Sequence, residues 1–359
     1  MRIDQVTPDL VGRDAVGMHI LNVQATLRNA GIESEIFYED ADDDMAALGL
    51  PIEELFEPVR DRKILFQMAI GSPGFDLMFR SDDPVMVQYH NITPAELIAP
   101  WEPAIAAGVK SGRAQLAAFA RRCSLGLGVS TYNQRELIDL GYSPTDVAPL
   151  LLDMRHEGRV ANPQVVERLT ATKVTDGPSL LFVGKVSPHK APHDLVNMLS
   201  TLRSLYYPNA TLTLVGSPLG TTYIEALRGY ITSLDLDDAV TIVGGVSGDV
   251  LEAHWQAADV FVCASEHEGF CAPLIEAMGH GLPVVSYGST AIPETVADAG
   301  LILSDKSPLV FAASVHKVLE DEALRDHLIE RGRRRARYFD LDQASVRFLD
   351  AVLQRPPSK

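Results

Sequence analysis

The chain has 359 residues, 46% of them hydrophobic, and its 48 acidic and 31 basic residues give a formal net charge of −17. This length and apolar content suffice for two domains with large cores. The acidic balance argues against broad binding to nucleic acid or to an anionic membrane. The three cysteines, Cys123, Cys263 and Cys271, form no CxxC pair, so we expect a reducing compartment and neither structural zinc nor a disulfide framework.

Targeting signals are not evident. No apolar run approaches the roughly 18–20 residues of a membrane span, and the first residues carry acids too early for a signal peptide. We therefore expect a cytoplasmic protein, with peripheral contact at the inner face of the membrane left open.

The first half of the chain alternates short apolar segments with amphipathic ones. A strand at about 2–6 is expected to lead into the glycine-bearing loop GRDAVG (12–17) and a helix. Further strands are expected at SEIFYE, KILFQMA, PVMVQYH, LGLGVS and VAPLLL, with helical stretches at ELIAPWEPAIAAG and GRAQLAAFARR. The polar stretch 162–179 loses this pattern, and we place a domain boundary there, which gives an N-terminal domain of 1–170 and a C-terminal domain of 171–340.

The second half follows the same plan more regularly. Apolar strands are expected at LLFVG (180–184), TLTLVG (211–216), VTIVGG (240–245), DVFVCAS (259–265), PVVSY (283–287) and GLILS (300–304). Continuous apolar strands that alternate with helices indicate a parallel sheet covered on both faces. The sequence therefore predicts an α/β protein with two Rossmann-like, doubly wound sheets, which collect ligands at their strand ends.

Two helical stretches follow the last strand. The first carries the only basic cluster, with arginines at 331, 333, 334, 335 and 337. Neighbouring arginines point around a helix rather than along one face. A solvated surface helix is the favoured interpretation, and a phosphate- or membrane-facing patch is the alternative.

Several common nucleotide and hydrolase motifs are missing. GRDAVG is followed by Met18, where an ATPase loop needs Lys and then Ser or Thr. No GxGxxG fingerprint follows a strand, and neither the HExxH helix of metalloproteases nor a GxSxG elbow occurs. The sequence thus argues against four frequent enzyme classes.

Two lysines lie on the loop VGKVSPHK, directly after the strand that ends at Gly184. Lys185 and Lys190 could hold a diphosphate at the carboxyl end of that strand. Lysines after strands are common, so an ordinary surface loop stays open at this point.

A second loop, SEHEGFCAPLIEAMGHG, follows the strand 259–265. We expect a helix from about Pro273 to His280, with Glu268 in the loop before it and Glu276 in its first turn. Backbone N–H groups at this helix start could donate to sugar or phosphate oxygens, while the carboxylates accept from sugar hydroxyls. The alternative is that both acids only favour the helix dipole, contributing ~0.3–1 kcal/mol each.

Together these motifs resemble the retaining family-4 glycosyltransferases (glycosyltransferase group 1). The resemblance rests on the Glu268-x7-Glu276 segment with ADVFVCASEHEGF before it and EAMGHGLPVVSYGSTAIPE after it, on VGKVSPHK, and on LVGSPLG and VTIVGGV. It covers about 180–305. The first domain fits more loosely, through GRDAVGMHI and VMVQYHNITP.

The resemblance implies a GT-B fold with the active site in a cleft between two domains, and a C-terminal helix (about 341–355) that packs back on the first domain. It implies that Lys185 and Lys190 neutralise the donor diphosphate, that Glu268 contacts sugar hydroxyls and that His90 lies near the transferred sugar. The donor-binding residues it implies are Gly17, Gly184, Val246, Gly269, Phe270, Cys271, Ala272 and, for the ribose, Glu276.

The resemblance further implies a retaining, metal-independent hexosyl transfer from a nucleotide-diphosphate sugar, with no cofactor and no bound metal. GDP-mannose or a UDP-sugar is the expected donor, and a glycan, a glycolipid or a small molecule the acceptor, as in cell-surface polysaccharide assembly. The alternatives are a nucleotide-sugar epimerase of the same fold and a non-catalytic nucleotide-sugar-binding subunit. Three positions depart from the family pattern: Lys185 replaces the usual Arg, Cys271 the usual Gly, and Gln67 a frequent His.

Overall fold

The computed structural model describes residues 1–12, 15–56, 59–153, 160–172 and 177–354. Within these ranges the chain forms two compact units. Unit 1 comprises Met1–Ala99, Pro103–Asp153 and Phe339–Lys359, and unit 2 comprises Pro100–Glu102 and Met154–Tyr338. The predicted boundary at 170/171 falls inside helix α6 (Pro163–Thr172), which contacts helix α9 (Gly248–Ala257) of unit 2.

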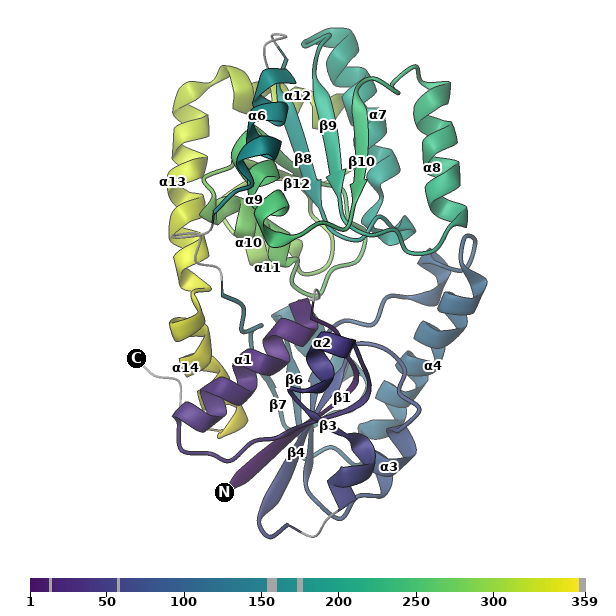
Figure 1. Cartoon of the computed structure of the whole chain (residues 1–359), viewed down its shortest axis with the longest axis vertical. Coiled ribbons are helices and arrows are strands. Elements are labelled where there is room, and N and C mark those ends of the chain that lie inside the picture. The colour runs from purple at the N-terminus through teal and green to yellow at the C-terminus, as the bar shows by residue number, and fades with distance from the viewer. Residues whose placement is uncertain (13–14, 57–58, 154–159, 173–176, 355–359) are drawn as a thin grey trace. The chain divides into compact units, whose positions relative to one another are not determined.

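Unit 1 is built on a seven-stranded parallel sheet of order β3-β2-β1-β4-β5-β6-β7 (Figure 1). Its strands are β1 (Arg2–Leu10), β2 (Ile36–Ala41), β3 (Leu50–Pro51), β4 (Arg62–Met68), β5 (Val85–Tyr89), β6 (Leu125–Gly128) and β7 (Thr145–Val147). Its α-helices are α1 (Ala15–Asn29), α2 (Asp43–Ala46), α3 (Phe75–Arg80), α4 (Pro103–Phe119), α5 (Thr131–Asp139) and α14 (Leu341–Val352). The central strands are buried on both faces, which explains their uninterrupted apolar sequences.

Two predicted elements of unit 1 are wrong. VAPLLL is not a strand, because β7 ends at Val147 and the following leucines are buried in irregular backbone. ELIAPWEPAIAAG is not one helix, because a 3-10 turn at Ala95–Leu97 stops before Pro100 and α4 begins only at Pro103. Proline cannot donate to a helix and restricts the residue before it, so each proline marks a boundary.

Unit 2 has a six-stranded parallel sheet of order β10-β9-β8-β11-β12-β13, with helices on both of its faces (Figure 1). Its strands are β8 (Ser179–Val183), β9 (Thr211–Val215), β10 (Val240–Gly244), β11 (Val260–Cys263), β12 (Val284–Tyr287) and β13 (Leu301–Leu303). Its helices after α6 are α7 (Pro192–Leu205), α8 (Thr222–Ser233), α9 (Gly248–Ala257), α10 (Ala272–Gly279), α11 (Ile292–Val296), α12 (Pro308–Glu320) and α13 (Glu322–Tyr338). All six predicted strands of this half are confirmed.

The basic cluster on α13 is partly used to hold α11. Arg335 donates from its guanidinium to the carbonyl oxygens of Thr295 and Glu294, at 3.0 and 2.6 Å, and Arg331 pairs with Asp298. These bonds satisfy carbonyl groups at the end of α11, where a helix lacks internal partners. Two members of the cluster therefore have a structural role.

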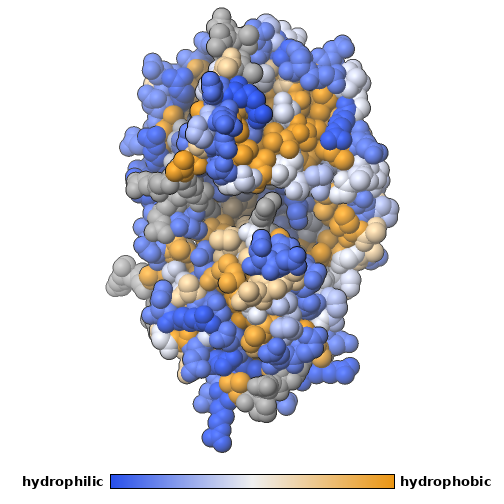
Figure 2. All heavy atoms as spheres, in the orientation of Figure 1, coloured by the Kyte–Doolittle hydropathy of each residue, from blue (hydrophilic) through white to orange (hydrophobic). Residues whose placement is uncertain are grey.

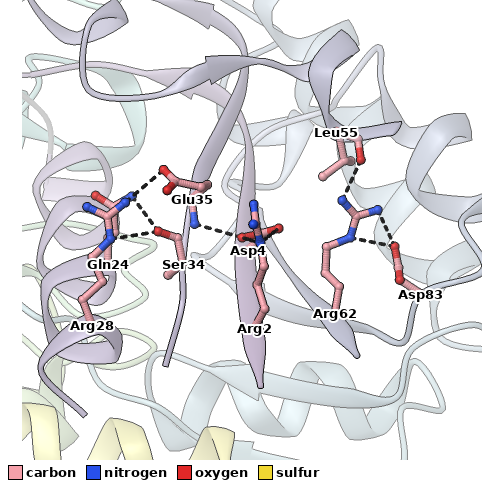
Figure 3. A network of polar contacts seen from close by, with 9 residues as sticks. All are labelled: Arg2, Asp4, Gln24, Arg28, Ser34, Glu35, Leu55, Arg62 and Asp83. Atoms are coloured by element: carbon pink, nitrogen blue, oxygen red, sulfur yellow. Dashed lines mark hydrogen bonds and ion pairs between the residues drawn. The ribbon is translucent and has the colours of Figure 1, made fainter. Parts of the chain in front are cut away.

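A polar network ties the amino-terminal ends of the unit 1 strands together (Figure 3). Asp4 of β1 accepts from the side chain of Arg2 and from the backbone N–H of Glu35, just before β2. Arg62 of β4 donates to Asp83, just before β5, at 2.9 and 2.6 Å. These groups satisfy one another at the sheet edge opposite the carboxyl ends, where ligands of such sheets bind.

The surface is mixed in character. Hydrophilic residues cover much of the face shown in Figure 2, with hydrophobic residues between them. Among the described residues, no helix has both the length and the apolar character needed to cross a membrane.

His19 of α1 joins several elements of unit 1. Its ring is fully buried; Nδ1 accepts from the backbone N–H of Leu151 at 2.8 Å, and Nε2 lies 3.1 Å from Gln88 Oε1 of β5. The ring also packs edge-on against Phe348 of α14, with 6.1 Å between ring centroids. Because Nδ1 accepts from a backbone donor, Nε2 carries the proton and the ring is neutral.

Burial lowers the pKa of His19 from 6.5 to about 4. Below about pH 6.5 the unfolded chain therefore binds a proton that the folded chain does not. We expect this histidine to reduce the free energy of unfolding by about 1 kcal/mol per pH unit between pH 6.5 and 4.

In urea titrations at pH 7, 6 and 5, the free energy of unfolding of the His19→Gln variant should depend less on pH than that of the native chain. His327→Gln, at an exposed histidine, should keep the native dependence, and equal slopes for all three proteins would contradict this role.

Candidate active site

The sheet of unit 2 reverses its strand order between β8 and β11, which are adjacent. The chain runs from β8 toward β10 on one side and from β11 toward β13 on the other. The two loops at this point are 184–191 and 264–271, which we call the lysine loop and the acidic loop. A doubly wound sheet opens its ligand crevice at such a switch point.

The two loops are joined by a short ion pair. Lys190 Nζ lies 2.6 Å from Glu268 Oε1, although 78 residues separate them in the sequence. Glu268 is 6% exposed. Burial is the largest single effect and opposes the charge on Lys190, but its neighbours, Glu268 foremost, together raise the pKa of the ammonium group. The site thus holds a charged lysine next to a buried carboxylate.

Backbone bonds fix the acidic loop around this pair. The N–H of Glu266 donates to His189 O of the lysine loop at 2.8 Å. Thr290 Oγ1 accepts from the N–H of Glu268 at 2.8 Å and lies 2.9 Å from its carbonyl oxygen. Lys306 adds a bridge, since its Nζ lies 2.6 Å from both Asp194 of α7 and Glu266. Rigid support of this kind preorganises a binding site.

Neither Thr290 nor Lys306 has a role that the sequence alone predicts. Thr290 belongs to the GSTAIPE segment, which was read only as part of a motif. Lys306 lies beyond the last strand, in a polar stretch with no pattern of its own. A motif scan could have identified Thr290, whereas the contacts of Lys306 with Asp194 and Glu266 become visible only in the folded structure.

The lysine loop leaves β8 through a constrained glycine pair. Gly184 has φ +151, and a Cβ added to Gly216 would lie 2.0 Å from Gly184 O, so only glycine allows this approach. Lys185 is exposed and forms no ion pair with a described residue, so its charge faces solvent. Val246 lies half-buried after β10.

Helix α10 begins at Ala272 and is not capped by a side chain. Its N-cap residue is Cys271, with φ +65 and ψ +66, in the left-handed region that favours glycine. Gly269 and Phe270 are buried just before it. An uncapped helix start with a tight turn before it suits an anionic or polar ligand.

Glu276 is the fifth residue of α10, so the expectation that it lies in the first turn is wrong. The cause is that the helix begins at Ala272, one residue earlier than predicted. Its half-buried side chain shares a helix face with the half-buried Ala272 and Pro273. Because the dipole effect falls off within the first turn, capping accounts poorly for Glu276. Glu268 is engaged with Lys190 instead.

The end of α10 follows the expected pattern. Gly281 has φ +74 and donates to Met278 O at 3.1 Å, and Leu282 donates to Ala277 O at 2.9 Å. This Schellman arrangement satisfies the last carbonyl groups of the helix. The predicted glycine stop is therefore confirmed, with His280 as the C-cap residue.

The remaining candidates belong to unit 1. Gly17 is buried in α1, and a Cβ there would lie 1.9 Å from Val11 O, so glycine is needed for the helix to pack on its own preceding loop. His90 follows β5, and its Nε2 lies 2.6 Å from Gln67 Oε1.

A chain of amides determines the proton position on His90. Gln5 Nε2 donates to Ile20 O, so Gln5 Oε1 accepts from Gln67 Nε2 at 2.9 Å. Gln67 Oε1 must then accept from Nε2–H of His90. Burial, assisted by the nearby His19, lowers the pKa of His90 well below its usual value. The Nδ1 lone pair, which has no partner in the described structure, remains as a hydrogen-bond acceptor, and Gln67 positions it.

Comparisons with known proteins identify relatives of this chain. Residues 168–335 match the family model described as glycosyl transferases group 1. D-inositol 3-phosphate glycosyltransferase of Kineococcus radiotolerans is 31% identical over 297 residues, which cover 75% of this chain and 66% of that protein. A GDP-mannose-dependent alpha-(1-6)-phosphatidylinositol monomannoside mannosyltransferase of Mycobacterium tuberculosis is 31% identical over 169 residues, covering 45% of this chain and 42% of that protein. The matched part of the chain thus spans about two thirds of the first relative and less than half of the second.

Among solved structures, Anabaena HepE in complex with UDP and glucose superposes with a TM-score of 0.75 at 18% identity, covering 99% of this chain and 100% of that chain. The chain has two Rossmann-like units, each built on a parallel sheet. Together with the structural likeness to HepE, these units define a GT-B fold. More particularly, residues 168–335 of the chain belong to glycosyltransferase group 1.

The conformation of Cys271 can be tested by a matched pair of substitutions. Both Cys271→Gly and Cys271→Ala remove the thiol, but only glycine adopts φ +65 without a steric cost. We expect the glycine variant to be more stable than the alanine variant by about 1 kcal/mol, the reverse of the usual order in helices. Urea unfolding of the two variants measures the difference, and equal stabilities would contradict the left-handed backbone at this position.

Proposed function

We propose that the protein is a retaining glycosyltransferase that transfers a hexose from a nucleotide-diphosphate sugar. The observation that carries this proposal is the Lys190–Glu268 pair, held at the switch point of the unit 2 sheet beside the uncapped start of α10. Such a donor carries a diphosphate and sugar hydroxyls. A cation and helix N–H groups suit the phosphate oxygens, and a carboxylate accepts hydrogen bonds from the hydroxyls. Membership of the family supports the same reaction class.

In this proposal the two lysines bind the donor diphosphate. Lys190 supplies a preorganised charge, and the exposed Lys185 closes on the phosphates as a mobile second cation. Their interaction strengthens as negative charge develops on the leaving phosphate, which lowers the barrier. The backbone of Gly269, Phe270 and Cys271 and the start of α10 donate to the phosphate and sugar oxygens.

Carboxylates serve as hydroxyl acceptors rather than as an acid and base pair. Glu268 accepts from the sugar ring hydroxyls, and Glu276 from the nucleotide ribose. In unit 1, Nδ1 of His90 is an acceptor for a hydroxyl of the transferred sugar. The acceptor's proton passes to the leaving phosphate on the same face, which retains the anomeric configuration, so no protein group need change its protonation.

The choice of donor rests on the relatives. The mycobacterial relative is GDP-mannose-dependent by name, and HepE was solved with UDP and glucose. We propose GDP-mannose or a UDP-hexose as donor and a glycan, a glycolipid or a polyol such as an inositol phosphate as acceptor.

Substitutions at the two loops test the site. We expect Lys190→Gln, which can still donate to Glu268, and Glu276→Ala each to lower the rate of sugar transfer by about 100-fold or more, about 2.7 kcal/mol in the barrier. Lys317→Ala, at an exposed lysine of α12 paired with Asp321, is the matched control and should transfer at the native rate. Circular dichroism verifies folding, and native rates in folded Lys190→Gln and Glu276→Ala would refute the site.

Donor identity and metal dependence can be measured together. In a thermal-shift panel of nucleotide sugars, the true donor at about 100 times its Kd should add about 2.7 kcal/mol of stability. Because lysines and helix N–H groups take the place of a metal here, the shift and the transfer rate should survive dialysis against EDTA. A product formed from the donor without any acceptor would instead identify an epimerase, and loss of activity that magnesium restores would contradict the metal-free mechanism.

A further inference from the structure

Two thiols flank the carboxylate of Glu268. The Sγ atoms of Cys263 and Cys271 and a carboxylate oxygen of Glu268 all lie within 4.8 Å of one another. The three residues are only 1%, 9% and 6% exposed, respectively. The Cys263 thiol donates to Ser265 Oγ at 3.3 Å. We call these three residues the thiol–carboxylate cluster, and the proposed transfer reaction uses neither of its thiols.

The donor set of this cluster suits a soft divalent cation. Tetrahedral zinc, with bonds of about 2.3 Å to sulfur and 2.0 Å to oxygen, holds its ligands roughly 3.5–3.8 Å apart. The separations within the cluster would therefore contract by at most about 1.0–1.3 Å to enclose the ion. Thiolates favour zinc and its soft relatives over magnesium or calcium, which prefer oxygen ligands.

The local structure supports this interpretation. Cys271 stands at φ +65, a backbone conformation that favours glycine, and its thiol does not cap α10. Lys190, which pairs with Glu268, has a side chain that is 20% exposed. Cys263 ends β11 and Cys271 precedes α10, so the framework fixes both sulfurs.

We propose that Cys263, Cys271 and Glu268 form an inhibitory binding site for zinc or a similar soft dication. Binding forms two metal–thiolate bonds and one metal–carboxylate bond and releases the two thiol protons to solvent. The metal occupies an oxygen of Glu268 that the donor sugar needs, so metal and donor compete. This competition rests on the proposed role of Glu268, whereas the binding itself does not.

Cobalt(II) is a direct spectroscopic probe of the cluster. Under anaerobic conditions with a phosphine reductant, the native chain should bind one equivalent of cobalt with a thiolate-to-metal charge-transfer band, and zinc should displace it. Cys271→Gly, whose backbone suits the turn, should fold and bind at least about 100-fold more weakly, and Cys263→Ala should behave likewise. Cys123→Ala removes the third cysteine, in unit 1, and should bind as the native chain does. Absence of the band in the native chain, or an undiminished band in Cys271→Gly, would overturn the proposal.

Kinetics then test the inhibition. Zinc should slow sugar transfer by the native chain and by Cys123→Ala, with the effect reversed by raising the donor concentration, and should leave folded Cys271→Gly unaffected. Equal zinc inhibition of Cys271→Gly and the native chain would contradict the assignment to this cluster. If neither the native chain nor any variant transfers sugar while the cobalt band follows the expected pattern, the transferase proposal fails and the metal site stands.

Discussion

The ion pair between Lys190 and Glu268 is the interaction on which the candidate site depends. A carboxylate that is 6% exposed is costly to bury without a partner, and the lysine 2.6 Å away supplies one. The pair also brings a loop that follows β8 against a loop that follows β11. Its geometry therefore places a cation and a hydroxyl acceptor side by side before any ligand arrives.

The strand order of unit 2 makes this pairing possible. Because β8 and β11 are neighbours at the reversal of the sheet, two loops far apart in the sequence meet at one edge. The Glu266–His189 backbone bond and the Thr290 hydroxyl hold them there. A binding site between fixed loops loses little entropy when a ligand binds, which is the property that a diphosphate site requires.

The sequence predicted the parallel strands of unit 2 well because buried strands leave long apolar runs that local pattern detects. The glycine after α10 was also predictable, because helices commonly end at a residue with positive φ, which glycine adopts most easily, and Gly281 has φ +74. The direct contact of Lys190 with Glu268 was not, because strand order depends on tertiary packing. VAPLLL was wrongly predicted as a strand because its buried leucines pack without pairing into the sheet. The role of Gln67 became visible only in the structure, where its amide orients His90.

Binding of a bare nucleoside diphosphate tests the central claim most directly. Titration calorimetry with GDP and with UDP should show that Lys190→Gln weakens binding of the preferred nucleotide by about tenfold or more, about 1.4 kcal/mol. Glu268→Gln should bind the same nucleotide as tightly as the native chain or more tightly, because Lys190 is then released from its carboxylate partner. Native affinity in Lys190→Gln, or a large loss in Glu268→Gln, would contradict a diphosphate site built on this ion pair.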